Sequence, residues 1–288
     1  MANQKNTGLL GPFLVFLSAV LFATGGLWFK FIPWHAMAIN AARSILAGLF
    51  LLTVSLVTHH KFRVTKSVLI AALGICVTNN LFSLANKLTT AGNAIVLQFT
   101  MPVYVILLMW LFFKKKPKVL DVTVCAAVLC GVVLFFLDEL SPEGLLGNIC
   151  ALVSGFFYAL FFIFNNREDS EPVTSTLIAY AASALIGLPW LIRTDFTAAP
   201  EGAPLWSVFA AVLALGFVQQ GCAQLSFSHG IKRTSAVTAA LVSGIEPVLN
   251  PVLVAVFQGE MLQPLAIVGG CIVLVSIVAY NALTAKNK

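Results

Sequence analysis

Charged residues are scarce in this chain. Only 10% of its 288 residues are Asp, Glu, Lys or Arg, whereas a soluble domain carries about 25%. None of the six cysteines stands in a CxxC pair or at a metal-ligand spacing from a histidine. The cysteines therefore behave as small apolar side chains. We expect neither a metal site nor a cofactor.

The chain also lacks the side chains that an enzyme inside a membrane would need. All four aspartates fall near the ends of apolar segments, so no aspartate-rich pair can hold a metal-bound diphosphate: Asp121, Asp138, Asp169 and Asp195. Ser154 and Ser243 lie within apolar segments, but no histidine lies mid-segment to act as their base. We therefore expect no catalytic residues. An intramembrane enzyme and a channel remain remote alternatives.

Long apolar runs fill the chain instead, with 59% hydrophobic residues and a mean hydropathy of +0.96. Each run is close to the roughly 20 residues that cross a hydrocarbon core. The ten segments are 8–29, 35–57, 67–86, 91–113, 119–137, 144–166, 173–192, 205–228, 234–257 and 263–284. Lipid satisfies no stray backbone group, so we expect helices. A cleavable signal peptide would have a shorter apolar core, of about 7–15 residues, so 8–29 is expected to be a span. The prediction is an all-α integral membrane protein with ten transmembrane helices.

An internal repeat divides the chain into two halves. A shift of 145 residues overlays 82–129 on 227–274 without a gap, and thirteen of those 48 positions are identical. The tetrapeptide GLLG occurs at 8–11 and again at 144–147. With five segments in each half, the second copy is inverted relative to the first, an arrangement typical of alternating-access transporters. We predict two inverted five-helix repeats, at 1–140 and 141–288.

The basic residues predict the orientation. If the N-terminus is cytoplasmic, thirteen Lys and Arg residues fall in inner segments and three in outer ones. This bias predicts cytoplasmic termini. It also accounts for the net charge of +6 without a nucleic acid partner. The run 114–118 is either a topology determinant or a contact for anionic lipid headgroups.

Polar residues gather in the third, fourth, eighth and ninth segments, which form two repeat-related pairs. Polar groups inside a membrane are costly, so they mark functional sites by default. The alternative is that the amides only join helices, at about 0.6 kcal/mol each. We expect a shared cavity with aromatic contributions from Trp28 and Tyr158. The expected substrate-binding residues are Trp28, Asn79, Asn80, Gln98, Tyr158, Gln219, Gln220, Gln224 and Glu246.

Two charged residues fall inside apolar segments. Glu246 lies mid-segment, opposite Met101 in the repeat and next to Pro247, which loosens the helix. It either carries a coupling proton or stabilises the break as a neutral, hydrogen-bonded group. Arg43 either binds a carboxylate bidentately or ties helices together.

These residues carry a resemblance to the drug/metabolite transporter superfamily, in its EamA-type members. The matching features are Arg43, Pro102–Val103 at the end of TAGNAIVLQFTMPV, IEPVLNPVL at 245–253, and Gly259 with Glu260. The chain departs from the family with Lys114 and Lys115 where Gly-Glu is common, and with Phe22 where a tryptophan is common. The resemblance implies ten spans, a central cavity between inverted repeats, and efflux of amino acids or related metabolites.

We therefore predict a secondary active transporter in the cytoplasmic (inner) membrane that moves small polar metabolites, exporting amino acids or related compounds by alternating access. An importer or an exchanger of the same fold is the alternative. Its expected partners are the small polar substrate and the lipid bilayer. A homodimer and the mode of coupling, by protons or by exchange, stay open.

Overall fold

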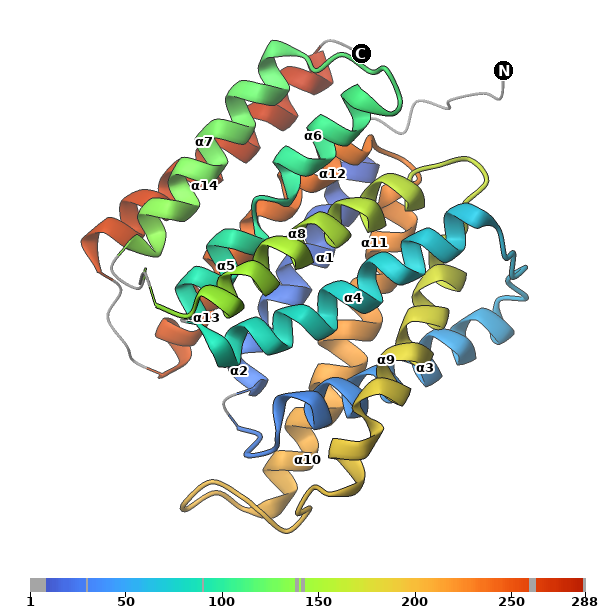
Figure 1. Ribbon diagram of the computed structural model, residues 1–288, viewed down its shortest axis with the longest axis vertical. Helices are drawn as coiled ribbons and strands as arrows, with labels where there is room; N and C mark the ends of the chain where they lie inside the picture. Colours follow the sequence, from blue (N-terminus) through green and yellow to red (C-terminus); the bar gives the residue numbers. More distant parts are fainter. Residues whose placement is uncertain are drawn as a thin grey trace.

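The computed structural model describes residues 9–29, 31–89, 91–137, 140, 143–258 and 263–286, and every regular element among them is helical (Figure 1). Lys5, Lys30, Asp138 and the Gly259–Glu260 pair lie outside these residues. The elements are α1 (Leu10–Ala23), α2 (Gly25–Phe29), α3 (Ala36–Val57), α4 (Lys66–Leu88), α5 (Ala91–Gln98), α6 (Met101–Leu111), α7 (Val119–Phe135), α8 (Leu145–Asn165), α9 (Pro172–Ile192), α10 (Leu205–Leu213), the π-helical η2 (Ala214–Cys222), α11 (Ala223–Ile231), α12 (Ala236–Val242), the 3₁₀ turn η3 (Ser243–Ile245), α13 (Glu246–Gln258) and α14 (Pro264–Lys286).

The helices have the length and composition of membrane spans. Among the described residues, seven are long and apolar enough to cross a bilayer, and the shorter apolar helices are Leu10–Ala23, Val119–Phe135 and Ala236–Asn250. The sides that face away from the bundle carry large exposed apolar side chains such as Leu185, Ile192 and Val275. Lipid would cover these sides. The predicted all-α membrane class is confirmed.

Two spans break at repeat-related places. The helix is interrupted at Phe99–Thr100, between α5 and α6, and again at η3, between α12 and α13. A proline follows each break at the second position of the next helix, Pro102 in α6 and Pro247 in α13. Proline has no N–H to donate to the carbonyl four residues earlier, and its ring crowds that carbonyl. The breaks therefore follow from the prolines that the sequence repeats.

The first span breaks for a different reason. The α1 helix ends at Thr24, whose hydroxyl donates to the carbonyl oxygen of Leu21 at 2.7 Å, and the next two residues are glycines. Thr24 thus competes for a backbone acceptor where the following residues have low helix propensity. The chain resumes as the short α2. The eighth span instead stays continuous but contains η2, and such π-helical insertions in α-helices are frequent at functional sites.

Pairs of helices from the two halves pack closely. The main pairs are α4 with α8, α3 with α9, α1 with α11, and α7 with α14, the last lying side by side at one edge (Figure 1). Glycine permits the closest approaches, as small residues do between membrane helices. A Cβ added to Gly74 of α4 would lie 2.8 Å from the carbonyl oxygen of Phe157 in α8. The bundle is therefore built mainly from contacts between halves.

Lysine-bearing loops from both halves meet at one end of the bundle. The Thr65 hydroxyl donates to the carbonyl oxygen of Asp169 at 3.0 Å, and Asn166 Nδ2 donates to the carbonyl oxygen of Thr234 at 2.6 Å. The Lys232 ammonium donates to the carbonyl of Arg167. Leu9 and Thr284, near the two ends of the chain, line one cavity together with residues 115–118. We call this the lysine-rich end.

The opposite end holds the other set of connections. The Thr89 hydroxyl at the end of α4 donates to Asn148 Oδ1 at the start of α8, at 2.7 Å. His35, which caps α3, stacks on Trp190 near the end of α9 with ring centroids 5.9 Å apart. Alternate connections therefore fall at opposite ends, as they do in a bundle that crosses a membrane repeatedly.

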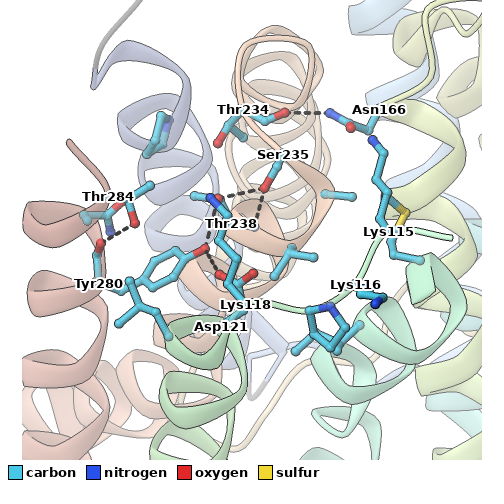
Figure 2. A pocket seen from close by; sticks show the side chains of 18 of the residues that line it. Lys115, Lys116, Lys118, Asp121, Asn166, Thr234, Ser235, Thr238, Tyr280 and Thr284 are labelled. Carbon is cyan, nitrogen blue, oxygen red and sulfur yellow. Dashed lines mark hydrogen bonds between the residues drawn. The ribbon is translucent and has the colours of Figure 1, made fainter. Parts of the chain in front are cut away.

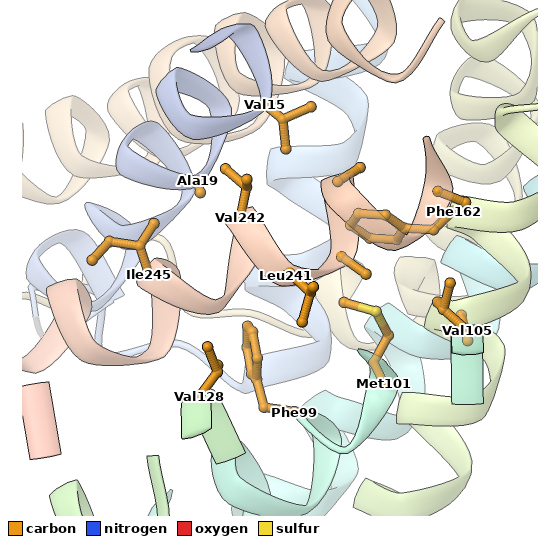
Figure 3. Close-up of a cluster of buried hydrophobic side chains, with 14 of the residues drawn as sticks. Val15, Ala19, Phe99, Met101, Val105, Val128, Phe162, Leu241, Val242 and Ile245 are labelled. Atoms are coloured by element: carbon orange, nitrogen blue, oxygen red, sulfur yellow. The ribbon is translucent and has the colours of Figure 1, made fainter. Parts of the chain in front are cut away.

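An apolar core occupies the middle of the bundle (Figure 3). It includes Val15 of α1, Met101 of α6, Phe162 of α8 and Leu241 of α12, all fully or almost fully buried. On each of these spans, the core residues lie between residues that line the cavity at the lysine-rich end and residues that line a different cavity on the other side of the core. On the ninth span, for example, 236–238 line one cavity, 239–245 are buried, and Glu246 lines the other.

Candidate functional site

A cavity of about 420 Å³ lies between the halves, on the side of the core away from the lysine-rich end. Spans one to four and six to nine all contribute to its wall, whereas α7 and α14 do not. The wall mixes amide and carboxyl side chains with aromatic rings. Ligand sites commonly combine a concave, largely apolar wall with a few convergent polar groups, so we take this cavity as the candidate site.

Seven of the nine side chains predicted from the sequence line this cavity. They come from both repeats: Asn79, Gln98, Tyr158, Gln219, Gln220, Gln224 and Glu246. The repeat mates Asn79 and Gln224 are both among them. The polar cluster in the sequence thus corresponds to one shared space.

The other two predicted residues do not line the cavity. Asn80 follows Asn79 on a helix that turns about 100° per residue, so it faces another direction, where its Nδ2 donates to the carbonyl oxygen of Cys76 at 2.8 Å. Trp28 lies beyond the Thr24 break and packs beside Val208 and Leu215 in a separate apolar cluster. The reorientation of α2 thus removes Trp28 from the site.

Several cavity amides also join helices, among them Gln98 and Gln224. Gln98 Nε2 donates to the Ser154 hydroxyl at 3.2 Å, which links α5 to α8. Gln224 Nε2 donates to the Thr176 hydroxyl at 2.8 Å, which links α11 to α9. For these two side chains, lining the cavity and joining helices are therefore compatible roles.

The two intramembrane charges face the same cavity from different repeats. Arg43 is on α3, and its Nε and Nη2 atoms donate to Asn40 Oδ1 at 3.1 and 2.9 Å. Glu246 is the first residue of α13, directly after the η3 break. A guanidinium and a carboxyl group therefore border one space of low dielectric, where a charge on either group interacts strongly with other charges.

Three buried polar atoms of the cavity lack a hydrogen-bond partner within the described part of the chain. They are Asn79 Nδ2, Gln219 Oε1 and Glu246 Oε2. A buried polar atom without a partner costs about 1–3 kcal/mol. One donor and two acceptors are thus available to a polar solute.

Sequence reasoning missed Tyr180 of α9, which lines the cavity and is hydrogen-bonded with Gln220. It lies in the seventh segment, which the repeat alignment does not cover. The only signal in the sequence was a tyrosine in the middle of an apolar run. Among the described residues, no group of three His, Cys, Asp or Glu side chains is placed to hold a metal ion.

Comparison with known proteins agrees with this architecture. The sequence model of the EamA-like transporter family matches residues 9–137 and again 145–282. An uncharacterized transporter of Bacillus subtilis, YwfM, is 23% identical over 98% of this chain and 97% of its own length. A solved crystal structure that is 18% identical superposes with a TM-score of 0.81 over 98% of this chain and all of its own, which shows a shared fold alone.

Two further relatives match more locally. An uncharacterized transporter of Synechocystis is 28% identical over 66% of this chain, and the match spans only 58% of that protein. The threonine/homoserine exporter RhtA of Escherichia coli is 26% identical over 73% of this chain and 69% of its own length.

Proposed function

We propose that this chain, which belongs to the EamA-like transporter family of the drug/metabolite transporter superfamily, is a secondary active transporter that exports amino acids or related small polar metabolites across the cytoplasmic membrane. The observation that carries the proposal is the central cavity, which both halves line with polar side chains, including the Arg43 guanidinium, the Glu246 carboxyl and three unpaired polar atoms. Membership of the family makes the chain a membrane transporter; the substrate and the direction of transport are proposed here.

The proposed topology is ten crossings in two inverted repeats with cytoplasmic termini. The seven long and three shorter apolar helices supply ten crossings. Both ends of the described chain line one cavity, which requires an even number. The family model also matches the chain twice.

Helix packing supports the same symmetry. Exchanging the halves converts the α4–α8 contact into the α1–α11 contact and the α3–η2 contact into the α4–α9 contact, while α3–α9 and α7–α14 map onto themselves. A pseudo-two-fold axis in the membrane plane accounts for this pattern. The breaks before Pro102 and Pro247 obey it as well.

Zwitterionic metabolites fit the chemistry of the cavity. The guanidinium of Arg43, whose Nε and Nη2 atoms also donate to Asn40 Oδ1, is a cationic group of the type that recognises carboxylates. Glu246 Oε2 and Gln219 Oε1 are unpaired acceptors, which suit an ammonium group. An α-amino acid carries both groups within a volume far smaller than 420 Å³. The name of RhtA supplies specific first candidates, threonine and homoserine.

Alternating access would require the core between the cavities to open. In this structure Val15, Met101 and Leu241 lie between the central cavity and the lysine-rich end. We therefore propose that the structure represents the state closed at the cytoplasmic end. Rocking of one repeat against the other would expose the same site to the cytoplasm.

Counterflow in proteoliposomes tests the proposal. Vesicles loaded with unlabelled threonine or homoserine should accumulate the labelled compound transiently and saturably. Arg43→Gln should reduce this uptake at least tenfold by removing the carboxylate partner, whereas Arg193→Gln, on an exposed residue that ends α9, should leave it unchanged. Linear flux without counterflow would indicate a channel. Failure of a wide amino acid panel would refute the proposed substrate class.

A further inference from the structure

A second cavity, of about 400 Å³, opens at the lysine-rich end and has no part in the proposed substrate site (Figure 2). Its wall combines α1, α6 and α7 of the first half with α12, α14 and Asn166, which follows α8, of the second. The buried core lies between this cavity and the central one. A molecule bound here would therefore contact both halves at the end that has to open.

The loop between α6 and α7 brings three ammonium groups to this cavity. Lys115, Lys116 and Lys118 line it and are exposed to solvent. Lys114 adopts a left-handed φ of 52°, and the Lys115 N–H donates to the carbonyl oxygen of Met109 at 3.0 Å. The turn is thus tied back to α6, which keeps the lysines that follow beside the cavity.

The lining carries net positive charge. The carboxylate in the described wall belongs to Asp121, which already accepts a hydrogen bond from the Tyr280 hydroxyl at 2.8 Å. That hydroxyl also lies 3.3 Å from Thr238 Oγ1. Asp121 is therefore held by Tyr280 of α14, and three lysines outnumber it. The cavity favours an anion with more than one acceptor oxygen, such as a phosphate group.

Apolar side chains form the rest of the wall. Ile106, Met109 and Leu120 line the cavity on the side of α6 and α7, and Pro12 and Val237 line it on the side of α1 and α12. A free phosphate ion would make no favourable contact with such a surface. A phosphate that carries an acyl chain would place its headgroup at the lysines and its first methylenes on these apolar side chains, which would remove both from water.

We propose that this cavity binds the headgroup of an acidic phospholipid, with Lys115, Lys116 and Lys118 as its phosphate partners. Basic pockets between transmembrane helices at the cytoplasmic face are suited to such headgroups. Because the wall is made by both halves, the bound lipid stabilises the arrangement in which the lysine-rich end is closed. The lipid thereby biases the transporter toward the state described here.

Lipid titration of the purified protein in detergent tests the site. Native mass spectrometry and thermal melting are followed with phosphatidylglycerol, phosphatidylcholine and inorganic phosphate as separate probes. We expect phosphatidylglycerol to bind and to raise the melting temperature, with little effect from the other two. In the triple variant Lys115→Gln/Lys116→Gln/Lys118→Gln, binding should weaken at least tenfold, since each basic residue near an anionic headgroup contributes roughly a fivefold factor.

A matched variant separates this cavity from general basicity. Lys61→Gln/Arg63→Gln/Lys66→Gln removes the same number of exposed charges from the same end of the bundle but outside the cavity, and should keep the phosphatidylglycerol effect. If the triple variant folds poorly, the single variant Lys116→Glu replaces it and should also weaken phosphatidylglycerol binding. The proposal is overturned if the cavity variants bind phosphatidylglycerol as the unaltered protein does. It is also overturned if phosphatidylcholine or inorganic phosphate produces the same shift.

Discussion

Single residues in this protein combine roles that are usually treated as alternatives. Gln98 and Gln224 bond to neighbouring helices and also line the central cavity. Glu246 and Gln219 each keep an acceptor without a partner in the described chain, although Gln219 Nε2 also donates to the carbonyl oxygen of Phe22 in α1 at 3.3 Å. The first pair acts through the shape of the site, and the second also through its unpaired acceptors. Substitutions at the two pairs should therefore have different consequences for folding and for transport.

Glu246→Gln tests proton coupling. The ionised carboxylate is costly to bury without a cation, and protonation neutralises it. A proton and a substrate ammonium would thus compete for Oε2. Such competition would couple export of the substrate to entry of a proton. We expect the variant to lose accumulation driven by a pH gradient but to keep counterflow with a raised KM, because the amide oxygen still accepts a hydrogen bond.

The matched control for that experiment is Glu201→Gln, which neutralises an exposed loop carboxylate. It should respond to a pH gradient as the unaltered protein does. An unchanged response in Glu246→Gln would exclude the coupling role, and Glu246 would then be a group that stabilises the helix break.

At the lysine-rich end, Ser67→Ala tests an electrostatic link between α4 and the α8–α9 connection. The Ser67 hydroxyl donates to Asp169 Oδ2 at 2.8 Å and is the main cause that lowers the pKa of that carboxyl. A lowered pKa in the folded state stabilises the protein above the pKa of the unfolded chain, about 3.9, and this gain is lost as pH falls through the folded pKa. Ser67→Ala should therefore reduce the melting temperature at pH 7 and have less effect near pH 3.5.

Thr197→Ala is the comparison for Ser67→Ala. It removes a similar bond, from the Thr197 hydroxyl to Asp195 Oδ1 at 2.6 Å, which also lowers the pKa of its carboxyl. That bond lies within one exposed loop and joins no helices. Its removal should hardly move the melting temperature at either pH. Equal effects of the two substitutions would argue against a structural role for the Ser67–Asp169 link.

Most residues that line the candidate site could be predicted from the sequence, because polar side chains are energetically costly inside a membrane and are therefore rare there. The amides of the third, fourth and eighth segments stood out against an apolar background, and the cavity collects them. Asn80 was mispredicted as a lining residue because composition does not reveal which face of a helix points inward. Trp28 was mispredicted because the Thr24 break depends on a local side-chain bond that periodicity does not register.

At the scale of elements, broken helices surround the site. The break at Thr24, the break before Pro102, η2 and the break before Pro247 all border the central cavity or contribute residues to it. The two proline breaks were predictable from the repeat. The π-helical η2 was not, because no sequence pattern distinguishes it from the α-helix around it. Its glycines, Gly216 and Gly221, pack closely against Leu46 and Phe50 of α3.

Close packing between elements predicts an asymmetric response to alanine. In Gly74→Ala, the new methyl group would lie 2.8 Å from the carbonyl oxygen of Phe157 and 2.9 Å from the amide nitrogen of Phe161, so α4 and α8 must separate. Overpacking of this kind costs about 1–3 kcal/mol. We expect a clearly lower melting temperature in detergent.

Gly48→Ala provides the contrast on α3, where the nearest atom would be Tyr180 Cβ at an ordinary 3.7 Å. Alanine favours a helix over glycine by about 1 kcal/mol. This variant should melt at the same or a slightly higher temperature. If Gly74→Ala melted as high as Gly48→Ala, the close α4–α8 contact would be refuted.

At the scale of the whole molecule, the sequence repeat makes a more specific prediction about the architecture than the apolar runs do. The runs alone leave the arrangement of the helices open, and three of them form helices shorter than a full span. The 145-residue shift implied that contacts come in related pairs, and the packing of α4 with α8 and of α1 with α11 fits that expectation. The repeat does not determine which side of the membrane each end faces; the distribution of basic residues predicts this orientation.

Impermeant thiol labelling tests that orientation. In a background with all six cysteines replaced by alanine, Glu143→Cys and Glu201→Cys lie on connections at the end opposite the lysines, whereas Lys61→Cys and Lys114→Cys lie at the lysine-rich end. Keeping basic residues in the cytoplasm is favoured during insertion. We therefore expect the two former cysteines to react in intact cells and the two latter only after permeabilisation. Labelling of Lys114→Cys from outside would show that the orientation is the opposite of the predicted one. The proposed phospholipid site would then lie in the outer leaflet.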